Sequence, residues 1–436
     1  MPRILVVYGT RPEAIKLAPV VTALRRTHCF ETVVAVTAQH RLMLDQVNGI
    51  FGIRPDHDLD LLRERPNLTG ITAGTIEGIE PLLAKYKPDM MLVQGDTTTV
   101  FAAALAAFYA QVPVAHLEAG LRTSHRYDPY PEEINRRLAT VLASLHLAPT
   151  SNARRNLEHE GVDPASIHVT GNTVIDALLQ VHGMHLPTTE PALDRIGDAE
   201  RLILVTSHRR ENWGAPMERI GRAVARLARR YPQARVLLPA HLNPIVRESL
   251  LPPLEGLDNV VVTAPLDYVD MAHAVAASTI VLTDSGGVQE EAPSLGKPVL
   301  VLRETTERPE AVEAGTVALV GTDEDRIVDT ASELLDEPAR YLEMARAVNP
   351  YGDGRASERV LGALGAYFGL NEPLEEFAGE AAGAASAEAR PTSRRPRAHP
   401  VLSRLVVPLR EAVQPARAAM RKPERETERS LNWGAR

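Results

Sequence analysis

The 436-residue chain contains one cysteine, Cys29, so it can form no internal disulfide and no cysteine cluster for zinc. It also lacks the charged start, apolar stretch and small-residue cleavage site of a signal peptide. No stretch approaches the ~20 consecutive apolar residues that a membrane-spanning helix needs. These absences predict a protein of the reducing cytoplasm, in which Cys29 is a small buried side chain.

Several ligand-binding signatures are also missing. The sequence has neither the GxGxxG pattern of dinucleotide-binding folds nor the GxxxxGK[ST] pattern of phosphate-binding loops. It has no HExxH pattern and no closely spaced aspartate pair in the predicted strand-end loops, so we expect no metal. A formal net charge of -8 without a dominant basic face argues against a nucleic-acid-binding protein.

What the sequence does contain is a repeated pattern of short apolar runs. These runs, rich in β-branched residues, alternate with longer segments of helical spacing, as in parallel sheets covered by helices. We expect strands within residues 3–9, 32–38, 89–96, 112–120, 145–150 and 167–172, and then within 201–208, 234–241, 259–265, 278–286, 297–304 and 317–322. A linker rich in Pro, Thr and Gly near residues 172–200 separates the two sets. The pattern predicts an α/β protein with two Rossmann-like domains, residues 1–172 and 173–354, that face one cleft.

The end of the chain has a different composition. A helix-like segment covers residues 352–368, and from about residue 373 the sequence is dominated by Ala, Glu, Arg and Pro with few apolar residues. Such a composition cannot bury enough surface to offset the entropy of ordering the chain. We therefore predict a disordered tail over residues 373–436.

Carboxylates follow several predicted strands of the first half. Asp96 and Glu118 each come directly after an apolar run, and Glu132 lies in the segment PEEINRR. Ligands of open parallel sheets bind beyond the carboxyl ends of the strands. Each acid alone could be a helix cap, but grouped carboxylates raise one another's pKa and suit general acid and base chemistry. Arg11 and Lys16 add cations near a helix start, where the helix dipole favours a bound anion.

Cations and a glycine turn follow the strands of the second half. His208 is followed by two arginines, and Ser285 precedes Gly286 and Gly287, whose backbone N–H groups would lie at a helix start. This combination is typical of a diphosphate site. Glu291, on the same predicted helix, is placed to accept hydrogen bonds from ribose hydroxyls, although alone it fits an ordinary acidic helix turn.

The two halves therefore differ in charge. A phosphate-binding second half opposite a carboxylate-bearing first half fits a nucleotide sugar as substrate. The nucleoside diphosphate would be held on one side and proton chemistry performed on the other.

The chain resembles the non-hydrolysing UDP-N-acetylglucosamine 2-epimerases of bacteria over about residues 3–365. The motifs that carry the resemblance are, in order, GTRPEAIK, QHR, QGDTTT, HLEAGLRT, PEEINRR, TGNTVID, HRREN, HLNP, TDSGGVQEEAPSLGKPVLVLR, TTERPE, EAGT and LVGT. The resemblance implies the glycosyltransferase-B architecture, with a last helix at about residues 355–370 packed back on the N-terminal domain. It also implies reversible conversion of UDP-GlcNAc to UDP-ManNAc, a precursor for surface polysaccharide, without a cofactor. The expected route is anti elimination of UDP through 2-acetamidoglucal, followed by readdition.

Roles pass from the family to the matching positions. Asp96, Glu118 and Glu132 are implicated in proton transfer, and His208 in stabilising or protonating the leaving diphosphate. The expected substrate contacts are Arg11 at the nucleotide, Lys16 at the reacting sugar, Ser285, Gly286 and Gly287 at the phosphates, Glu291 at the ribose and Arg308 at the sugar. The resemblance leaves open which carboxylate acts as the base in each direction.

Two further properties of the family are expectations for this chain. Many bacterial members form homodimers, and many bind a second UDP-GlcNAc as an activator. The matching activator positions are Gln39, Arg65 and His241. Leu42 stands where activated members carry a second glutamine, so the retention of activation is left open.

Four alternatives remain at this point. The first is a 2-epimerase of a modified UDP-sugar, such as a diacetamido uronate. The second is a glycosyltransferase of the same architecture, although its acceptor domain would not need these carboxylates. The third is a hydrolysing epimerase that releases ManNAc, and the fourth is a noncatalytic nucleotide-sugar sensor.

Overall fold

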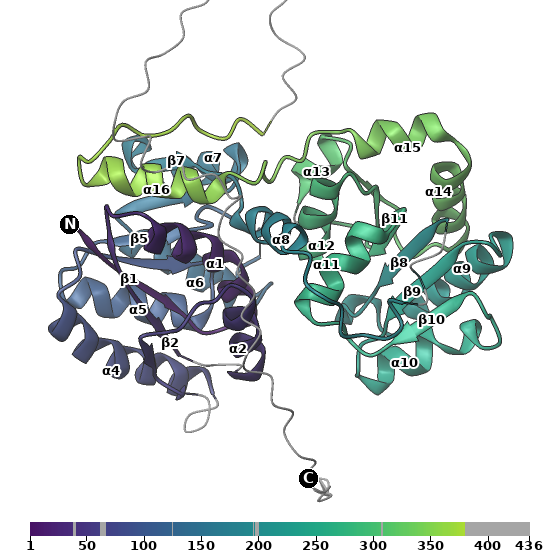
Figure 1. Ribbon diagram of the computed structural model, residues 1–436, viewed down its shortest axis with the longest axis horizontal. Coiled ribbons are helices and arrows are strands. Elements are labelled where there is room, and N and C mark those ends of the chain that lie inside the picture. The colour runs from purple at the N-terminus through teal and green to yellow at the C-terminus, as the bar shows by residue number, and fades with distance from the viewer. Residues whose placement is uncertain are drawn as a thin grey trace, which may run out of the picture. The chain divides into compact units, whose positions relative to one another are not determined.

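Two parallel β-sheets with helices around them form the described part of the protein. The computed structural model describes residues 1–37, 41–61, 67–123, 125–194, 196, 200–306 and 308–379. Figure 1 shows the strands of each sheet and the helices that connect them. The predicted α/β class is confirmed. The described residues belong to one compact unit, and the division at residue 172 stays a prediction.

The first sheet has the strand order β3-β2-β1-β4-β5-β6-β7 within the described residues. Its strands are β1 (Arg3–Tyr8), β2 (Glu31–Val36), β3 (His57–Asp58), β4 (Met90–Gln94), β5 (Val114–Leu117), β6 (Leu145–Ala148) and β7 (Ile167–Val169). Its helices are α1 (Arg11–Arg26), α2 (Arg41–Ile50), α4 (Leu68–Tyr86), α5 (Thr98–Tyr109), α6 (Glu132–Leu142), α7 (Ser151–His159) and α8 (Thr173–Gly183). The central strands are continuous apolar runs because both of their faces are covered.

The second sheet has the order β10-β9-β8-β11-β12-β13. Its strands are β8 (Leu202–Thr206), β9 (Arg235–Pro239), β10 (Val260–Thr263), β11 (Ile280–Thr283), β12 (Val299–Val301) and β13 (Val317–Leu319). Its helices are α9 (Ala215–Arg230), α10 (Pro244–Leu250), α11 (Tyr268–Ala277), α12 (Gly286–Glu291), α13 (Pro309–Glu313), α14 (Glu324–Asp336) and α15 (Pro338–Ala345). In each sheet the strand order reverses direction beside the first strand, at β1/β4 and at β8/β11. Such reversals are the usual ligand positions of doubly wound sheets.

Helix α16 (Ala356–Tyr367) follows the second sheet but packs on helices of the first half. Val360 and Leu364 are fully buried in one apolar cluster with Ile4 and Val6 of β1. The chain then continues to Phe377, whose side chain is buried and whose amide donates to the Val169 carbonyl (2.9 Å). The predicted tail therefore begins too early at residue 373, because Phe377 supplies an apolar anchor. Residues from 380 onward lie outside the described residues.

Asp176 of α8 holds the start of α16. Its buried carboxylate accepts from the Ala356 amide (3.1 Å), the Ser357 amide (2.8 Å) and the Ser357 hydroxyl (2.6 Å). Helix starts carry unpaired N–H groups, so this carboxylate acts as a cap from a distant helix. Burial raises its pKa to about 6.

We expect Asp176→Ala to lower the free energy of unfolding by about 2–4 kcal/mol, because three buried donors lose their acceptor. Ser357→Ala removes only the hydroxyl and should cost about 1 kcal/mol. Since the folded protein binds the Asp176 proton more tightly than the unfolded chain, this group's stabilisation declines as pH rises from about 4 to 6. In urea denaturation, the free energy of unfolding that Asp176→Ala loses relative to the wild type should thus be larger at pH 5 than at pH 7.5. If Asp176→Ala and Ser357→Ala lost the same free energy of unfolding, this role of Asp176 would be contradicted.

The predicted strands all appear, but β3 was missed. With two residues at the sheet edge, β3 is too short to produce an apolar run. No helix within the described residues is long and apolar enough to span a membrane.

Candidate active site

The loop after β1 is tied to the loop after β4 by a buried carboxylate. Thr10 caps α1, and Glu13 completes a capping box by accepting from the Thr10 amide (2.7 Å). Glu13 also accepts from the Gly9 amide (3.2 Å) and from the Thr97 hydroxyl (3.0 Å). Burial raises the pKa of Glu13 to about 7. Glu13 therefore holds the start of α1, which carries Arg11 and Lys16, against the loop that carries Asp96, at the strand-order reversal between β1 and β4.

Lys16 and Glu118 form a buried ion pair at this edge of the sheet. The Lys16 ammonium lies 2.6 Å from both carboxylate oxygens of Glu118, and the two side chains are 19% and 7% exposed. Gln94 donates a further hydrogen bond to Glu118. Burial alone would raise the pKa of Glu118, but the charge and hydrogen bonds of Lys16 outweigh it, so the pKa falls below 4.5. Glu118 is therefore ionised at neutral pH.

The backbone at Glu118 contributes to this geometry. Residue 118 follows the last residue of β5 and has φ 65°, in the left-handed region that non-glycine residues rarely adopt. Two positions earlier, the buried His116 ring contacts the Gly95 carbonyl (2.7 Å). Burial lowers the pKa of His116 to about 4, so this imidazole is neutral.

Asn172 connects this pair to the second half of the chain. Its side-chain amide donates to Glu118 (3.1 Å) and to Glu290 (2.8 Å), and its oxygen caps α8. Glu290 in turn accepts from the Arg308 guanidinium (2.5 Å). The result is a buried network of two ion pairs, Lys16–Glu118 and Arg308–Glu290, in which Asn172 bridges the two carboxylates. Burial raises the pKa of Glu290, against the opposing charges of Arg308 and Lys16.

Asp96 and Glu132 lie beside this network. Asp96 is paired with Arg136 of α6, and its carbonyl accepts from the Asn135 side chain (3.0 Å). Burial raises the pKa of Glu132, and the charge of Asp96 adds to the shift. Glu118 and Glu132 thus differ in the direction of their pKa shifts, which is a property of acid and base pairs.

In the second half, the His208 loop is held by Asp284, which follows β11. Asp284 is fully buried and accepts from the backbone amides of His208 and Arg209, both at 3.0 Å to Oδ2. The His208 ring is 44% exposed and stacks on the exposed His241 ring, with centroids 6.1 Å apart. Burial lowers the pKa of His208, and Asp284 opposes this shift.

The predicted phosphate turn lies at the start of α12. Ser285 is the residue before the helix and makes no side-chain cap, so its hydroxyl is not used to close the helix end. Gly286 lies under the Arg308 guanidinium, because a Cβ there would fall 2.7 Å from Arg308 Cζ. Glu291 ends α12, near the Tyr268 hydroxyl and Arg11, and its pKa is raised to about 8 by burial and by the charge of Glu290.

We expect Gly286→Ala to leave the fold intact but to weaken the binding of UDP, the nucleoside diphosphate that the sequence resemblance implies, about tenfold. The added methyl group would take the place of the Arg308 guanidinium and move it away from the turn that is predicted to hold the phosphates, and the loss of one charge-assisted hydrogen bond to the phosphates corresponds to roughly 1.5 kcal/mol. Gly49→Ala is a matched control, since no atom lies within 4 Å of the added Cβ. Isothermal titration with UDP measures both. An unchanged Kd for Gly286→Ala would mean that Arg308 does not contact the nucleotide.

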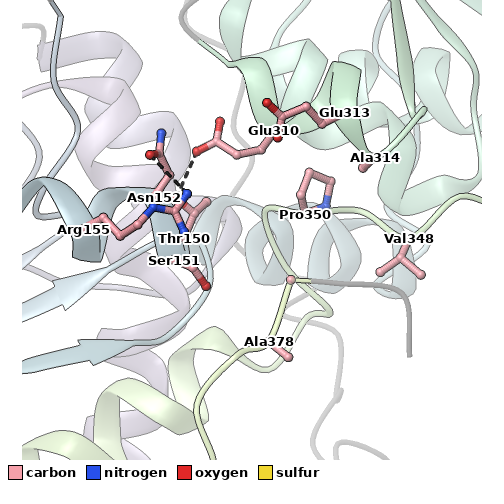
Figure 2. Close-up of a pocket in the computed structure, with 11 residues that line it drawn as sticks. Thr150, Ser151, Asn152, Arg155, Glu310, Glu313, Ala314, Val348, Pro350 and Ala378 are labelled. Atoms are coloured by element: carbon pink, nitrogen blue, oxygen red, sulfur yellow. Dashed lines mark hydrogen bonds between the residues drawn. The ribbon is translucent and has the colours of Figure 1, made fainter. Parts of the chain in front are cut away.

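A pocket of about 380 Å³ lies next to this network (Figure 2). Thr150 and Asn152 at the start of α7 face Glu310 of α13, and the Thr150 hydroxyl donates to Glu310 (3.1 Å). None of the predicted site residues lines this pocket. Glu310 follows Arg308 by two positions, so the pocket and the charged network share one loop.

The chain matches the sequence profile of UDP-N-acetylglucosamine 2-epimerase over residues 22–365. The chain belongs to this family. The epimerase of Yersinia pestis is 52% identical over 368 residues, which are 83% of this chain and 98% of that protein. The Bacillus subtilis epimerase is 49% identical over 379 residues, 87% of this chain and 99% of that protein. The crystal structure of the Neisseria meningitidis epimerase bound to UDP-GlcNAc is 47% identical, with a TM-score of 0.76, and covers 83% of this chain and 99% of that one.

Membership of the epimerase family fits the site as built here, although the individual residue roles stay predictions. Lys16, Asp96, Glu118 and Glu132 lie close enough to act on one another's charge. His208 lies between His241 and Asp284, the residue before Ser285, and Arg308 covers Gly286 of the same turn. Gln39 and Arg65 lie outside the described residues. Within the described ranges, no group of three or more His, Cys, Asp or Glu side chains is arranged to hold a metal.

Four buried side chains that hold this site together were not predicted from the sequence: Glu13, Asn172, Asp284 and Glu290. Asn172 lies in the motif TGNTVID and Asp284 in TDSGG, so both stood in quoted motifs. Their partners are 54 to 118 positions away, which no local pattern reveals.

Proposed function

We propose that this protein interconverts UDP-N-acetylglucosamine and UDP-N-acetylmannosamine by eliminating and readding UDP. The observation that carries the proposal is the buried Lys16–Glu118 pair at the end of β5, linked through Asn172 to Glu290 and Arg308. Through this arrangement the ionised carboxylate of Glu118, from the first sheet, is connected to the guanidinium of Arg308, from the second sheet. A guanidinium is suited to bind a diphosphate.

In the proposed elimination, a carboxylate takes the C2 proton and the C–H electron pair forms the C1=C2 bond. The C1–O bond breaks, and its electron pair leaves on the diphosphate. Glu118, ionised by Lys16, suits the base, and Glu132, with its raised pKa, suits the acid. Protonation of the opposite face and readdition of UDP give the other epimer. No electrons are gained or lost overall, so the reaction needs no redox partner.

The leaving diphosphate gains charge as the C1–O bond breaks, and donors fixed in advance stabilise this charge. His208, Arg308 and the turn at Ser285 would supply them. Arg308 pairs with Glu290, so a diphosphate that binds Arg308 would compete with this carboxylate.

Incubation of the purified protein with UDP-GlcNAc in deuterated water, followed by NMR, tests the proposal. The expected products are UDP-ManNAc and both UDP-sugars with deuterium at C2. Free ManNAc with UDP would indicate a hydrolysing epimerase, and no change without an acceptor would fit a transferase. Turnover of a diacetamido uronate alone would change the substrate.

Three variants test the predicted roles: Asp96→Asn, Glu118→Gln and His208→Ala. Each should reduce turnover by orders of magnitude without loss of the fold. Wild-type rates of C2 deuterium incorporation in all three variants would sink the assignment of this site.

We also propose a homodimer. Phe108 (59% exposed) and Tyr109 (69%) end α5, and Leu138 (41%) and Val141 (82%) lie on the neighbouring α6. Exposed apolar residues on adjacent helices are typical of an interface between subunits. Light scattering should give twice the chain mass for the wild type and the chain mass for Val141→Glu. A monomeric wild type would refute the dimer.

The activator site is a further proposal, of which only His241 lies within the described residues. Because His241 stacks on His208, a ligand held by His241 would act directly on the diphosphate side of the site. UDP-GlcNAc added to an assay started from UDP-ManNAc should accelerate the reaction. A lack of acceleration at any concentration would rule this site out.

A further inference from the structure

We propose that Asp284 is a positioning residue, which fixes the His208 ring with Nδ1–H toward its carboxylate and Nε2 toward the substrate's diphosphate. The inference rests on the proposed function for its catalytic meaning. Its geometric part rests only on the contacts of the two residues.

Asp284 is placed where it can act on this loop. Strands β8 and β11 are the two neighbouring strands at the strand-order reversal of the second sheet. Asp284 directly follows β11, and His208 lies two residues beyond the end of β8. The Asp284 side chain is fully buried. A buried ionised carboxylate is costly unless its lone pairs are satisfied, so its set of donors indicates its task.

Almost all the donors to Asp284 come from the His208 loop. Ser207 donates its hydroxyl (2.8 Å), His208 and Arg209 donate backbone amides (both 3.0 Å), and Asn212 donates its side-chain amide (3.0 Å). Asn212 also donates to the Leu302 carbonyl (3.0 Å), which ties the loop to the end of β12. This carboxylate therefore sets the path of the loop as well as the place of the ring.

A further contact of this carboxylate reaches the ring itself. Nδ1 of His208 lies 3.3 Å from Oδ1 of Asp284. A neutral imidazole carries one proton, and a carboxylate beside one ring nitrogen favours the proton on that nitrogen. A proton on Nδ1 faces the carboxylate and leaves Nε2 as the nitrogen available to a ligand. On protonation, Nε2 gains the N–H that can donate to a diphosphate oxygen.

The charges around His208 also favour this role of Asp284. The charged and titratable groups that face His208 are Asp284, which favours the protonated ring, and Arg209 and His241, which oppose it. When the C1–O bond breaks, Nε2–H donates to the diphosphate oxygen that receives the electron pair, and readdition reverses this step. The charge of Asp284 offsets the positive charge of the ring, since it raises the pKa of His208. Its removal should therefore lower the pKa of His208.

The test uses the full chain with isotope-labelled histidine, with the His208 signal assigned by its loss in His208→Gln. Nitrogen NMR of the wild type should show the Nδ1–H form of the neutral ring. A predominant Nε2–H form would overturn the proposal without the use of any variant. In Asp284→Asn, the NMR titration midpoint of His208 should fall. The alkaline limb of kcat should shift to lower pH, with kcat about 10- to 100-fold lower at pH 8 and partly recovered at pH 6.

Ser207→Ala is the matched control, because it removes one donor to Asp284 but keeps the carboxylate. It should leave the His208 titration and the position of the pH limb unchanged. Equal shifts in both variants would mean that the loop, not the charge, governs His208, and the proposal would fail. If Asp284→Asn does not fold, the wild-type tautomer decides. The expected tautomer without any UDP-sugar turnover would overturn the proposed function but support the positioning of the ring.

Discussion

The variant Glu118→Gln is expected to lower kcat for UDP-GlcNAc epimerisation about 10²- to 10⁴-fold, the usual contribution of a general acid or base. Glutamine has the size of glutamate and can still accept from Gln94 and Asn172, but it cannot take a proton at neutral pH. The fold should survive, because the Lys16 ammonium keeps Glu290 and Asp96 as charged neighbours. KM should change much less than kcat, since the loss affects the transition state.

The control for this variant is Glu80→Gln, which neutralises an exposed carboxylate of α4. Its kcat should equal that of the wild type. NMR assays in deuterated water give kcat and C2 exchange together, and circular dichroism checks the fold. If Glu118→Gln exchanged the C2 proton at the wild-type rate, Glu118 would be a structural partner of Lys16 and not a proton carrier.

Lys16→Met should have the largest effect on stability, a loss of about 3–5 kcal/mol in the free energy of unfolding. Methionine fills a similar volume, but it leaves Glu118 and Glu290 buried and joined through Asn172 without the charge of Lys16 beside them. The double variant Lys16→Met/Glu118→Gln should recover part of the loss, because it removes one of the two carboxylates. Urea denaturation of the four proteins measures this coupling.

The stability that Lys16→Met loses depends on pH because Lys16 is paired with Glu118. Its pKa in the folded protein is below the ordinary 4.5, so its stabilisation is present above about pH 4.5 and is lost as pH falls through the folded value. Without Lys16 this pKa rises and the carboxyl takes up a proton more readily. The Lys16→Met deficit should therefore be larger at pH 8 than at pH 5. A deficit independent of pH would point to lost packing alone.

The sequence was sufficient to predict the fold class, since short apolar runs such as the one within Met90–Gln94, alternating with helical segments, are typical of central parallel strands. It also indicated which loops meet, because the carboxyl ends of parallel strands share one edge. Local pattern failed where stability comes from distant partners. Phe377 looks like part of a polar tail until its amide meets Val169 across more than two hundred positions.

The same limit applied within the site. Glu290 was one of two adjacent acids, and nothing local distinguished its role from that of Glu291. The structure separates them, because Glu290 points to Arg308 and Asn172 while Glu291 lies near Tyr268 and Arg11. Asn172 caps α8 with its side-chain oxygen, and the nitrogen of the same amide group donates to two carboxylates far away in the sequence.

The left-handed backbone at Glu118 restricts which residues evolution or design can place there. Valine, isoleucine and threonine are excluded twice, because they lack the carboxylate and because a branched Cβ is strained at φ 65°. Aspartate keeps the charge and tolerates this conformation better than most residues, but its side chain is shorter by one methylene group. The substitution Glu118→Asp therefore separates two requirements that are usually confounded, since it keeps the backbone conformation and the charge but loses the reach to Lys16.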